Sequence, residues 1–215
     1  MPSFNIAEFI ANFSCLDDIK KTAGTITKDL LAYYHGDEPG QIPGILPGPP
    51  GSHAGGYYWF QGANLWSTLI DYWHYTGDSS HNDLIAQGLL AQRGENNNYL
   101  PANFSASIGN DDQADWALAA LLAAERGFPN PPSDKPKWVD MSVNVFNDMV
   151  ARWDTKTCQG GLRWQIFTTN KGYDVKLCKS PIFSSFSSLY ATEENHTLTA
   201  TQAAPTLASL TSQPD

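Results

Sequence analysis

The sequence predicts an all-α fold, and three observations support this. Five segments between residues 17 and 153 repeat apolar residues every three or four positions, the period of a helix. The connections between these segments suit antiparallel helices, and no strand-type alternation separates them. The chain has 215 residues, which is long enough for one sizeable hydrophobic core.

The first two predicted helices differ in character. Residues 17–34 carry one apolar stripe and precede Gly36, which can end a helix. Residues 57–75 are apolar or aromatic on nearly every face, which is typical of a helix buried among others. Thr76-Gly77-Asp78 is expected to end this second helix. Between the two helices, residues 36–56 are dense in Pro and Gly, and a loop of this length is either functional or a plain connector.

Three further helices are predicted. Residues 83–92 form the third, the fourth starts near Asp111 and stops at Gly127 and Pro129, and residues 134–153 form the fifth. Fully apolar and amphipathic helices alternate along the chain, so we expect an inner and an outer layer. Gly161–Phe167 is expected to be a short strand or an extended segment.

Two terminal regions stand apart from the helical part. Residues 1–16 form a lead-in, and residues 177–215 form a divergent tail. From Ser180 onward the chain is rich in Ser, Thr and Ala and has little helical periodicity, so its composition predicts a flexible or disordered segment.

Charge and composition restrict the class of ligand. The net charge of −9 argues against a nucleic-acid partner, which needs clustered Lys and Arg. Charged residues are scarce at 16%, whereas aromatic residues reach 12%. This balance favours a polar, uncharged ligand such as a sugar, whose C–H faces pack on Trp and Tyr rings.

Neither a metal site nor a cofactor is predicted. No Cys-x-x-Cys pair or Cys/His cluster occurs, and an odd cysteine count leaves the disulfide pairing open. The N-terminus carries Glu8 and lacks a basic region, so it is a poor signal peptide, and no apolar run could span a bilayer. Glycosylation sequons, which matter only in a secreted chain, occur at Asn12, Asn103 and Asn195.

Gly109-Asn110-Asp111-Asp112-Gln113 holds the candidate chemistry. Asn110 is expected to be the N-cap of the fourth helix, with Gln113 completing a capping box. Asp111 and Asp112 then lie in the first turn. Glycoside hydrolysis usually needs two carboxyl groups, and this pair can supply them. The plainer alternative is that first-turn acids only stabilise the helix dipole.

Several longer motifs resemble glycoside hydrolase family 76, in particular its fungal cell-wall branch of endo-α-1,6-mannanases. The resemblance runs in order through residues 17–176, which it marks as a partial catalytic domain. The motifs that carry it are Tyr57–Ala63, Leu69–Asp78, Gly109–Gln113, Ala123–Arg126, Phe128–Pro132 and Gly160–Gln165.

This resemblance implies an (α/α)6 toroid and a retaining mechanism, with Asp111 as nucleophile and Asp112 as general acid/base. An (α/α)6 toroid has twelve helices, so five predicted helices indicate an incomplete ring. The family usually has Trp-Glu where this chain has Phe60-Gln61. The expected substrate-binding residues, of which the aromatic ones could instead serve core packing, are Tyr58, Trp59, Gln61, Asn110, Gln113 and Trp164.

The implied function is hydrolysis of α-1,6-mannosidic linkages in fungal cell-wall or anchor glycans. The expected partner is therefore α-1,6-mannan or another mannose-containing glycan. By family, the protein is expected to be secreted to the cell wall or to the outer face of the plasma membrane, where a lipid anchor would hold it. Two alternatives stay open: a transglycosidase that attaches glycoproteins to the wall, and an inactive fragment or glycan-binding remnant.

Overall fold

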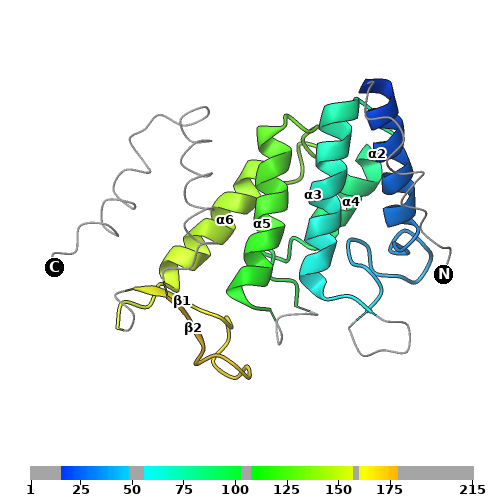
Figure 1. The fold of residues 1–215 in the computed structure, drawn as a ribbon. Helices are drawn as coiled ribbons and strands as arrows, with labels where there is room; N and C mark the ends of the chain where they lie inside the picture. Colours follow the sequence, from blue (N-terminus) through cyan, green and yellow to red (C-terminus); the bar gives the residue numbers. More distant parts are fainter. Residues whose placement is uncertain (1–15, 49–55, 103–107, 157–159, 179–215) are drawn as a thin grey trace.

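A computed structural model describes residues 16–48, 56–102, 108–156 and 160–178. Within these ranges lie five helices and two short strands, so the predicted all-α class is confirmed (Figure 1). No helix of the described ranges is long and apolar enough to cross a membrane. The three sequons, Cys15, Cys158, residues 1–15 and residues 179–215 fall outside them. The elements are α2 (Leu16–Leu31), α3 (Trp59–Thr76), α4 (Asn82–Ala91), α5 (Asn110–Glu125), α6 (Trp138–Ala151), β1 (Gly161–Arg163) and β2 (Lys176–Cys178).

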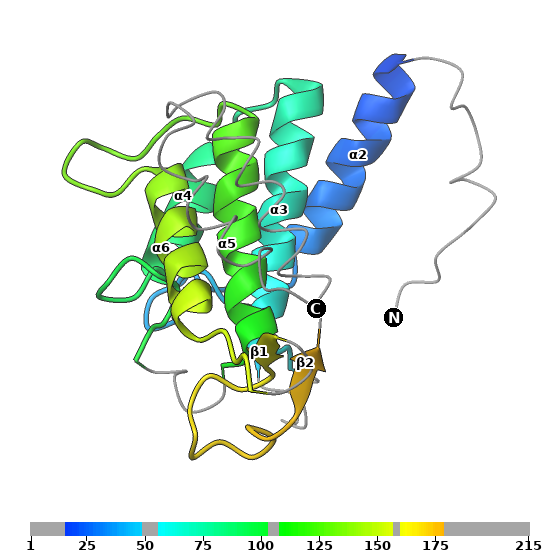
Figure 2. The ribbon, with the colours of Figure 1, turned by 90° about the vertical axis from the view of Figure 1, so that its left-hand side faces the viewer.

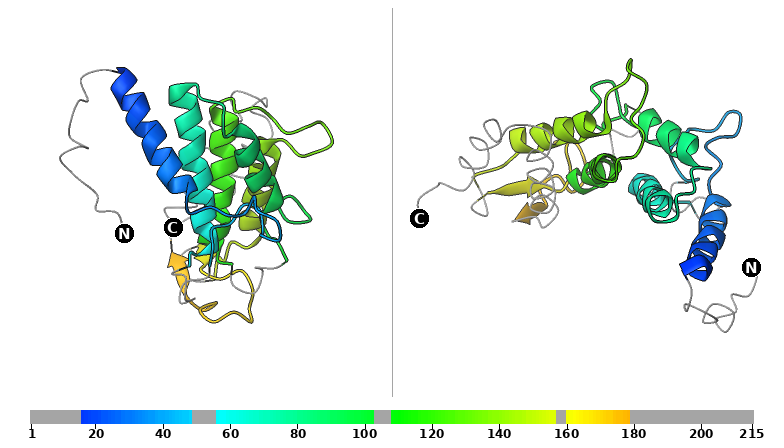
Figure 3. Two further views of the ribbon diagram at one scale, coloured as in Figure 1. Left: turned by 90° about the vertical axis from the view of Figure 1, so that its right-hand side faces the viewer. Right: turned by 90° about the horizontal axis from the view of Figure 1, so that it is seen from above.

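The helices form the two predicted sets. The apolar helices α3 and α5 lie side by side, α6 packs on α5, and both α2 and α4 pack on α3. Seen from above, α4 and α6 share one side of the α3–α5 pair (Figure 3). Both α3 and α5 begin at the lower end in Figure 1, so residues at their first turns are brought to the same end of the molecule.

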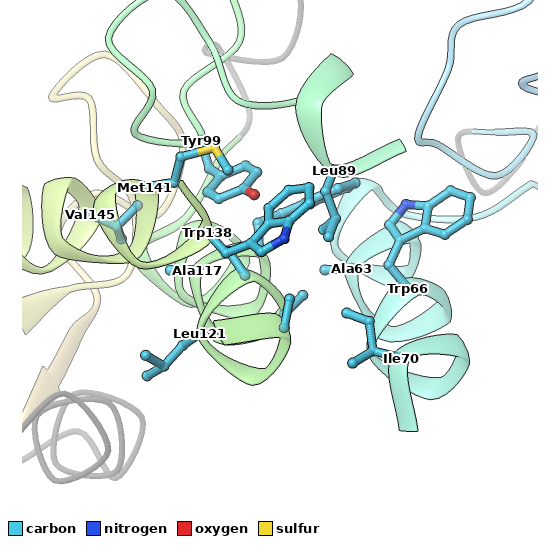
Figure 4. Packing of buried hydrophobic residues seen from close by; sticks show 14 of the residues in the cluster. Ala63, Trp66, Ile70, Leu89, Tyr99, Ala117, Leu121, Trp138, Met141 and Val145 are labelled. Carbon is cyan, nitrogen blue, oxygen red and sulfur yellow. The ribbon is translucent and has the colours of Figure 1, made fainter. Parts of the chain in front are cut away.

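Large aromatic side chains lie among aliphatic ones in the core between these helices (Figure 4). Trp66, Trp116 and Trp138 are completely buried. The Trp116 ring stacks on Trp59 of α3 and on Tyr99 of the loop before α5, with centroid distances of 5.1 Å and 5.7 Å. One side chain thus links the first turn of α3 to the second turn of α5.

Helix α2 ends three residues earlier than predicted. Its apolar period continues to Tyr34, but the helix stops at Leu31. Tyr34 leaves the helix to become buried against Trp66, with the two ring centroids 4.9 Å apart. Its hydroxyl accepts a hydrogen bond of 2.9 Å from the Gly44 amide. A tertiary contact, rather than Gly36, therefore sets this helix end.

Helix α6 is also shorter than the predicted 134–153. It begins at Trp138, and the Asp140 carboxylate accepts a hydrogen bond of 3.1 Å from the Lys137 amide. Pro136 lies just before this cap, and the residue before a proline is disfavoured in helical geometry. Helix α3 behaves as predicted at its end, where Gly77 adopts a left-handed φ of +79°.

The described part of the Pro/Gly-rich loop is packed rather than merely connecting. Trp66 donates a hydrogen bond to the Gly44 carbonyl and Gln92 donates one to the Pro43 carbonyl, at 2.9 Å and 2.7 Å. A Cβ at Gly44 would lie 2.4 Å from the Gly88 carbonyl oxygen, and Gly44 has a φ of +93°. Only glycine satisfies both conditions. Residues 49–55 of this loop lie outside the described ranges.

A small hairpin adjoins the start of α5 (Figure 2). β1 pairs antiparallel with β2, with Leu162 opposite Leu177. Residues 161–167, predicted to be a short strand or an extended segment, contain both: β1 covers the first three residues, and the chain beyond it runs beside the start of α5. The Asn110 amide donates to the Trp164 carbonyl at 2.8 Å, and Gly109 forms an isolated bridge with Gln165.

Candidate active site

The acidic pair lies in the first turn of α5, but the cap differs from the prediction. Gly109, not Asn110, is the N-cap, and Asp112, not Gln113, is the residue whose side chain reaches back to the N-cap amide. The Asp112 carboxylate accepts a hydrogen bond of 2.7 Å from the Gly109 amide. Asn110 does not cap the helix because its side chain donates instead to the Arg163 carbonyl, at 2.8 Å.

Both carboxyl groups of the pair crowd around Gly109. A Cβ there would lie 2.1 Å from Asp111 Oδ1 and 3.2 Å from Asp112 Oδ2. These two oxygens can therefore be no farther apart than the sum of those distances, so they lie within the roughly 5–5.5 Å typical of the carboxyl groups of retaining glycosidases. The Asp112 amide also donates to Asp111 Oδ1 at 3.0 Å, which orients that carboxylate.

A buried polar network holds this turn from inside the protein. Arg152, at the end of α6, donates to Asn110 Oδ1 at 2.9 Å and to Gln113 Oε1. Gln113 in turn donates to the Asn98 carbonyl at 2.7 Å. Asn110 and Gln113 were both predicted to contact sugar. Asn110 is 2% exposed and Gln113 is fully buried, and both belong to this network. The sequence analysis did not predict that Arg152 or Asn98 would support the site.

Electrostatics distinguish Asp112. Burial raises the pKa of its carboxyl group to about 6; the hydrogen bond from the Gly109 amide opposes this shift, and the charge of Asp111 adds to it. Asp112 therefore keeps its proton into mildly acidic conditions, as a general acid requires.

A third carboxyl group, Asp115, lies one turn along the same helix. Burial, with smaller contributions from the charges of Asp112 and Asp111, raises its pKa to about 6. The sequence analysis missed this residue, although its spacing of four from Asp111 would have placed it on the same helix face.

Replacing Asp115 by Asn is expected to stabilise the protein more at pH 7 than at pH 4. A raised carboxyl pKa means that the folded state binds the proton more tightly, so this group's contribution to stability falls as pH rises from about 4 to about 6. We expect the variant to melt about 2–4 °C above the parent at pH 7, with little difference at pH 4. Melting curves at both pH values check this. Asp29→Asn, at an exposed position in α2, is the control; an equal effect at both positions would contradict the prediction.

The four other predicted sugar contacts divide into two groups. Tyr58 and Trp164 are 60% and 38% exposed, so their rings are available to a ligand. Trp59 is only partly buried: it packs against the core, where it stacks on Trp116 and donates a hydrogen bond of 2.8 Å to Gln92 Oε1.

Gln61 has a structural role at the start of α3. It accepts a hydrogen bond of 2.8 Å from the Tyr58 amide. Since either Glu or Gln completes a capping box, the departure from the Trp-Glu pair typical of the family leaves this cap intact.

Within the described ranges, no three His, Cys, Asp or Glu side chains are grouped so that they could hold a metal ion.

A mainly helical scaffold that presents two carboxyl groups at a helix start is compatible with a glycosidase. Comparisons with known proteins identify the family. The profile described as Glycosyl hydrolase family 76 matches residues 18–206, which extends past the boundary predicted near Lys176. The chain belongs to this family.

Named relatives agree with this assignment. The mannan endo-1,6-alpha-mannosidase DCW1 of Candida glabrata is 46% identical over 164 residues, which cover 75% of this chain and 35% of the relative. The DCW1 protein of Saccharomyces cerevisiae, with the same enzyme name, is 41% identical over 160 residues, covering 74% and 34%.

A solved structure supports the fold. The crystal structure of Dfg5 from Chaetomium thermophilum in complex with glucosamine superposes with a TM-score of 0.81 at 41% identity. The match covers 92% of this chain and 49% of that one. The five helices thus belong to the all-α toroid that the resemblance implied. The chain spans about a third of the length of the curated relatives and half of the solved chain.

Proposed function

We propose that this chain carries the catalytic carboxyl groups of a mannan endo-1,6-α-mannosidase that retains anomeric configuration. The observation that carries the proposal is the crowding of Asp111 and Asp112 around Gly109, which keeps one oxygen of each carboxyl group within the distance that a retaining mechanism allows. The names of the relatives support α-1,6-linked mannose as the substrate. Secretion, a lipid anchor and a place at the cell wall belong to the same proposal.

Asp111 acts as the nucleophile in this mechanism. Its carboxylate attacks the anomeric carbon, forming a C–O bond to the enzyme while the glycosidic C–O bond breaks. The hydrogen bond from the Asp112 amide fixes Asp111 Oδ1, so the other oxygen is the one left to attack. The neighbouring Gly109 has no side chain to obstruct the sugar.

Asp112 acts as the general acid and then as the general base. In the first step it gives its proton to the departing glycosidic oxygen. In the second step it takes a proton from water, whose oxygen attacks the anomeric carbon and releases Asp111. A pKa of about 6 leaves the carboxyl group largely protonated at the start of the cycle in mildly acidic medium.

Exposed aromatic rings border this end of the molecule. Tyr58 precedes α3, and Trp164 follows β1, whose chain runs beside the start of α5. Both rings are exposed, and sugar rings pack on such surfaces. We assign both residues to substrate binding.

The stereochemistry of the product tests the proposal. Nuclear magnetic resonance of the first reducing ends released from α-1,6-mannan should show the α anomer. Asp112→Asn should lower the rate on mannan by about 10²–10⁴-fold, because proton transfer is lost. The same variant should lose far less on an aryl mannoside whose leaving group needs no proton. A first-formed β anomer, or an Asp112→Asn enzyme equally slow on both substrates, would contradict the assigned roles.

A further inference from the structure

A polar cavity lies beside the start of α5. Its volume is about 300 Å³, and it opens between the end of α6, the first residue of α5 and the chain that follows β1. Asn110 lines it, whereas neither member of the catalytic pair is among its described lining residues. Because Asp111 follows Asn110 directly, the cavity adjoins the proposed site of cleavage.

Cations outnumber carboxylates among the residues that line this cavity, although Asp148 and Asp174, which are not among them, lie 3.9 Å and 3.7 Å from the two arginines. Three of its lining residues are the cations Arg152, Lys156 and Arg163, against the single carboxylate of Asp154. The whole chain has a net charge of −9, so this concentration of cations departs from the rest of the molecule. Local positive charge with low-dielectric walls attracts anions.

Both guanidinium groups keep unused donors. Arg152 donates through Nε and Nη2, but its Nη1 lies 3.9 Å from the Asp148 carboxylate, beyond hydrogen-bond reach. Arg163 donates through Nη2 to Asp154 at 2.9 Å, and its Nη1 lies 3.7 Å from Asp174. Within the described residues, neither Nη1 has a hydrogen-bond acceptor. An arginine has five donors, so both can bind an added oxyanion.

Aromatic rings complete the lining. The Arg163 guanidinium lies over the Tyr173 ring, 4.8 Å from its centroid, which holds the planar group in place. Trp153 lines the same cavity. Rings of this kind are surfaces for the apolar face of a sugar.

We propose that this cavity binds a phosphate group carried by a sugar. A phosphate ester bears about −1.5 to −2 charges at neutral pH and presents three acceptor oxygens, which matches two guanidinium groups and an ammonium group. The phosphate part of this inference rests on the cations alone, and the sugar part rests on the proposed function. The substrate class would then be mannose-containing glycans with a phosphate substituent near the cleaved bond.

Calorimetric titration of the full chain with mannose 6-phosphate, mannose and inorganic phosphate tests the proposal. Mannose 6-phosphate is expected to bind at least about tenfold more tightly than either of the others, and its affinity should fall as salt is added. Arg163→Gln should weaken its binding by about tenfold or more. Lys156→Gln should weaken it in the same direction; since Lys156 is exposed, this variant is expected to fold normally. Lys135→Gln is the matched control. Lys135 forms an exposed ion pair with Asp134 before the start of α6, whereas the cavity lies at the other end of that helix.

Several outcomes would overturn the inference. Equal affinity for mannose and mannose 6-phosphate would show that the cavity does not recognise the phosphate group. Equal affinity for inorganic phosphate and mannose 6-phosphate would show that it does not recognise the sugar. Unchanged binding in both cavity variants would remove the site. Phosphate-dependent binding without hydrolysis would sink the proposed function alone, whereas normal hydrolysis without phosphate-dependent binding would sink this inference alone.

Discussion

Asp111→Asn is expected to lower mannan hydrolysis by roughly 10³-fold or more, because an amide cannot form the glycosyl ester. The fold should survive this change. The amide oxygen of Asn can still accept the hydrogen bond that the Asp112 amide now gives to Asp111 Oδ1. The lost charge at the helix start is worth only about 0.3–1 kcal/mol. Initial rates on α-1,6-mannan and thermal melting of the same preparation measure both quantities.

A chemical rescue makes this prediction sharper. In Asp111→Gly, azide can enter the space left by the carboxylate and attack the same face of the sugar, giving a β-mannosyl azide from an activated α-mannoside. Asp134→Asn, at an exposed position in the loop before α6, should hydrolyse mannan at the parental rate. Turnover by Asp111→Asn within tenfold of the parent would remove Asp111 as the nucleophile.

Trp116→Ala is expected to lower the free energy of unfolding by about 3–5 kcal/mol, the usual cost of emptying a buried tryptophan site. The ring is completely buried and joins α5 to α3. Its Cζ2 atom lies 3.0 Å from the place where Gly62 of α3 would carry a Cβ. Urea unfolding followed by circular dichroism measures the loss.

Two further variants separate packing from other effects. Trp116 Nε1 is buried without a hydrogen-bond partner among the described residues, so Trp116→Phe loses no hydrogen bond and should cost much less than Trp116→Ala. Trp164→Ala removes a ring that is 38% exposed and should also cost less. Equal losses at both tryptophans, or a Phe variant as unstable as the Ala variant, would refute a packing role for Trp116.

The helices could be predicted from the sequence because apolar period and burial agree along most of their length. Where they disagree, tertiary contacts set the helix ends. Tyr34 continues the period of α2 but leaves the helix to pack on Trp66 and to accept a hydrogen bond from Gly44. The start of α6 is instead set locally, because the Asp140 carboxylate accepts a hydrogen bond from the Lys137 amide three residues before it.

The candidate site was predicted only in part. The Asp111-Asp112 pair stands out because its motif is local and sits at a helix start. The supporting network does not, since Arg152 reaches Asn110 and Gln113 from about 40 residues away in the chain. A hydrogen bond between residues so far apart in the chain leaves no repeating pattern in the sequence from which it could be predicted.

The sequence by itself determined the all-α class, the number of described helices, the acidic pair and the family, because each depends on local pattern or motif. Only the tertiary structure decided which residue caps α5, which predicted sugar contacts are buried, and that burial raises the pKa of Asp115 as well as that of Asp112. It alone assembled the cationic cavity from Arg152, Lys156 and Arg163, which lie in the sequence as separate charges. The physical reason is that burial, and with it the pKa values and hydrogen-bond partners of polar groups, depends on neighbours that are distant along the chain.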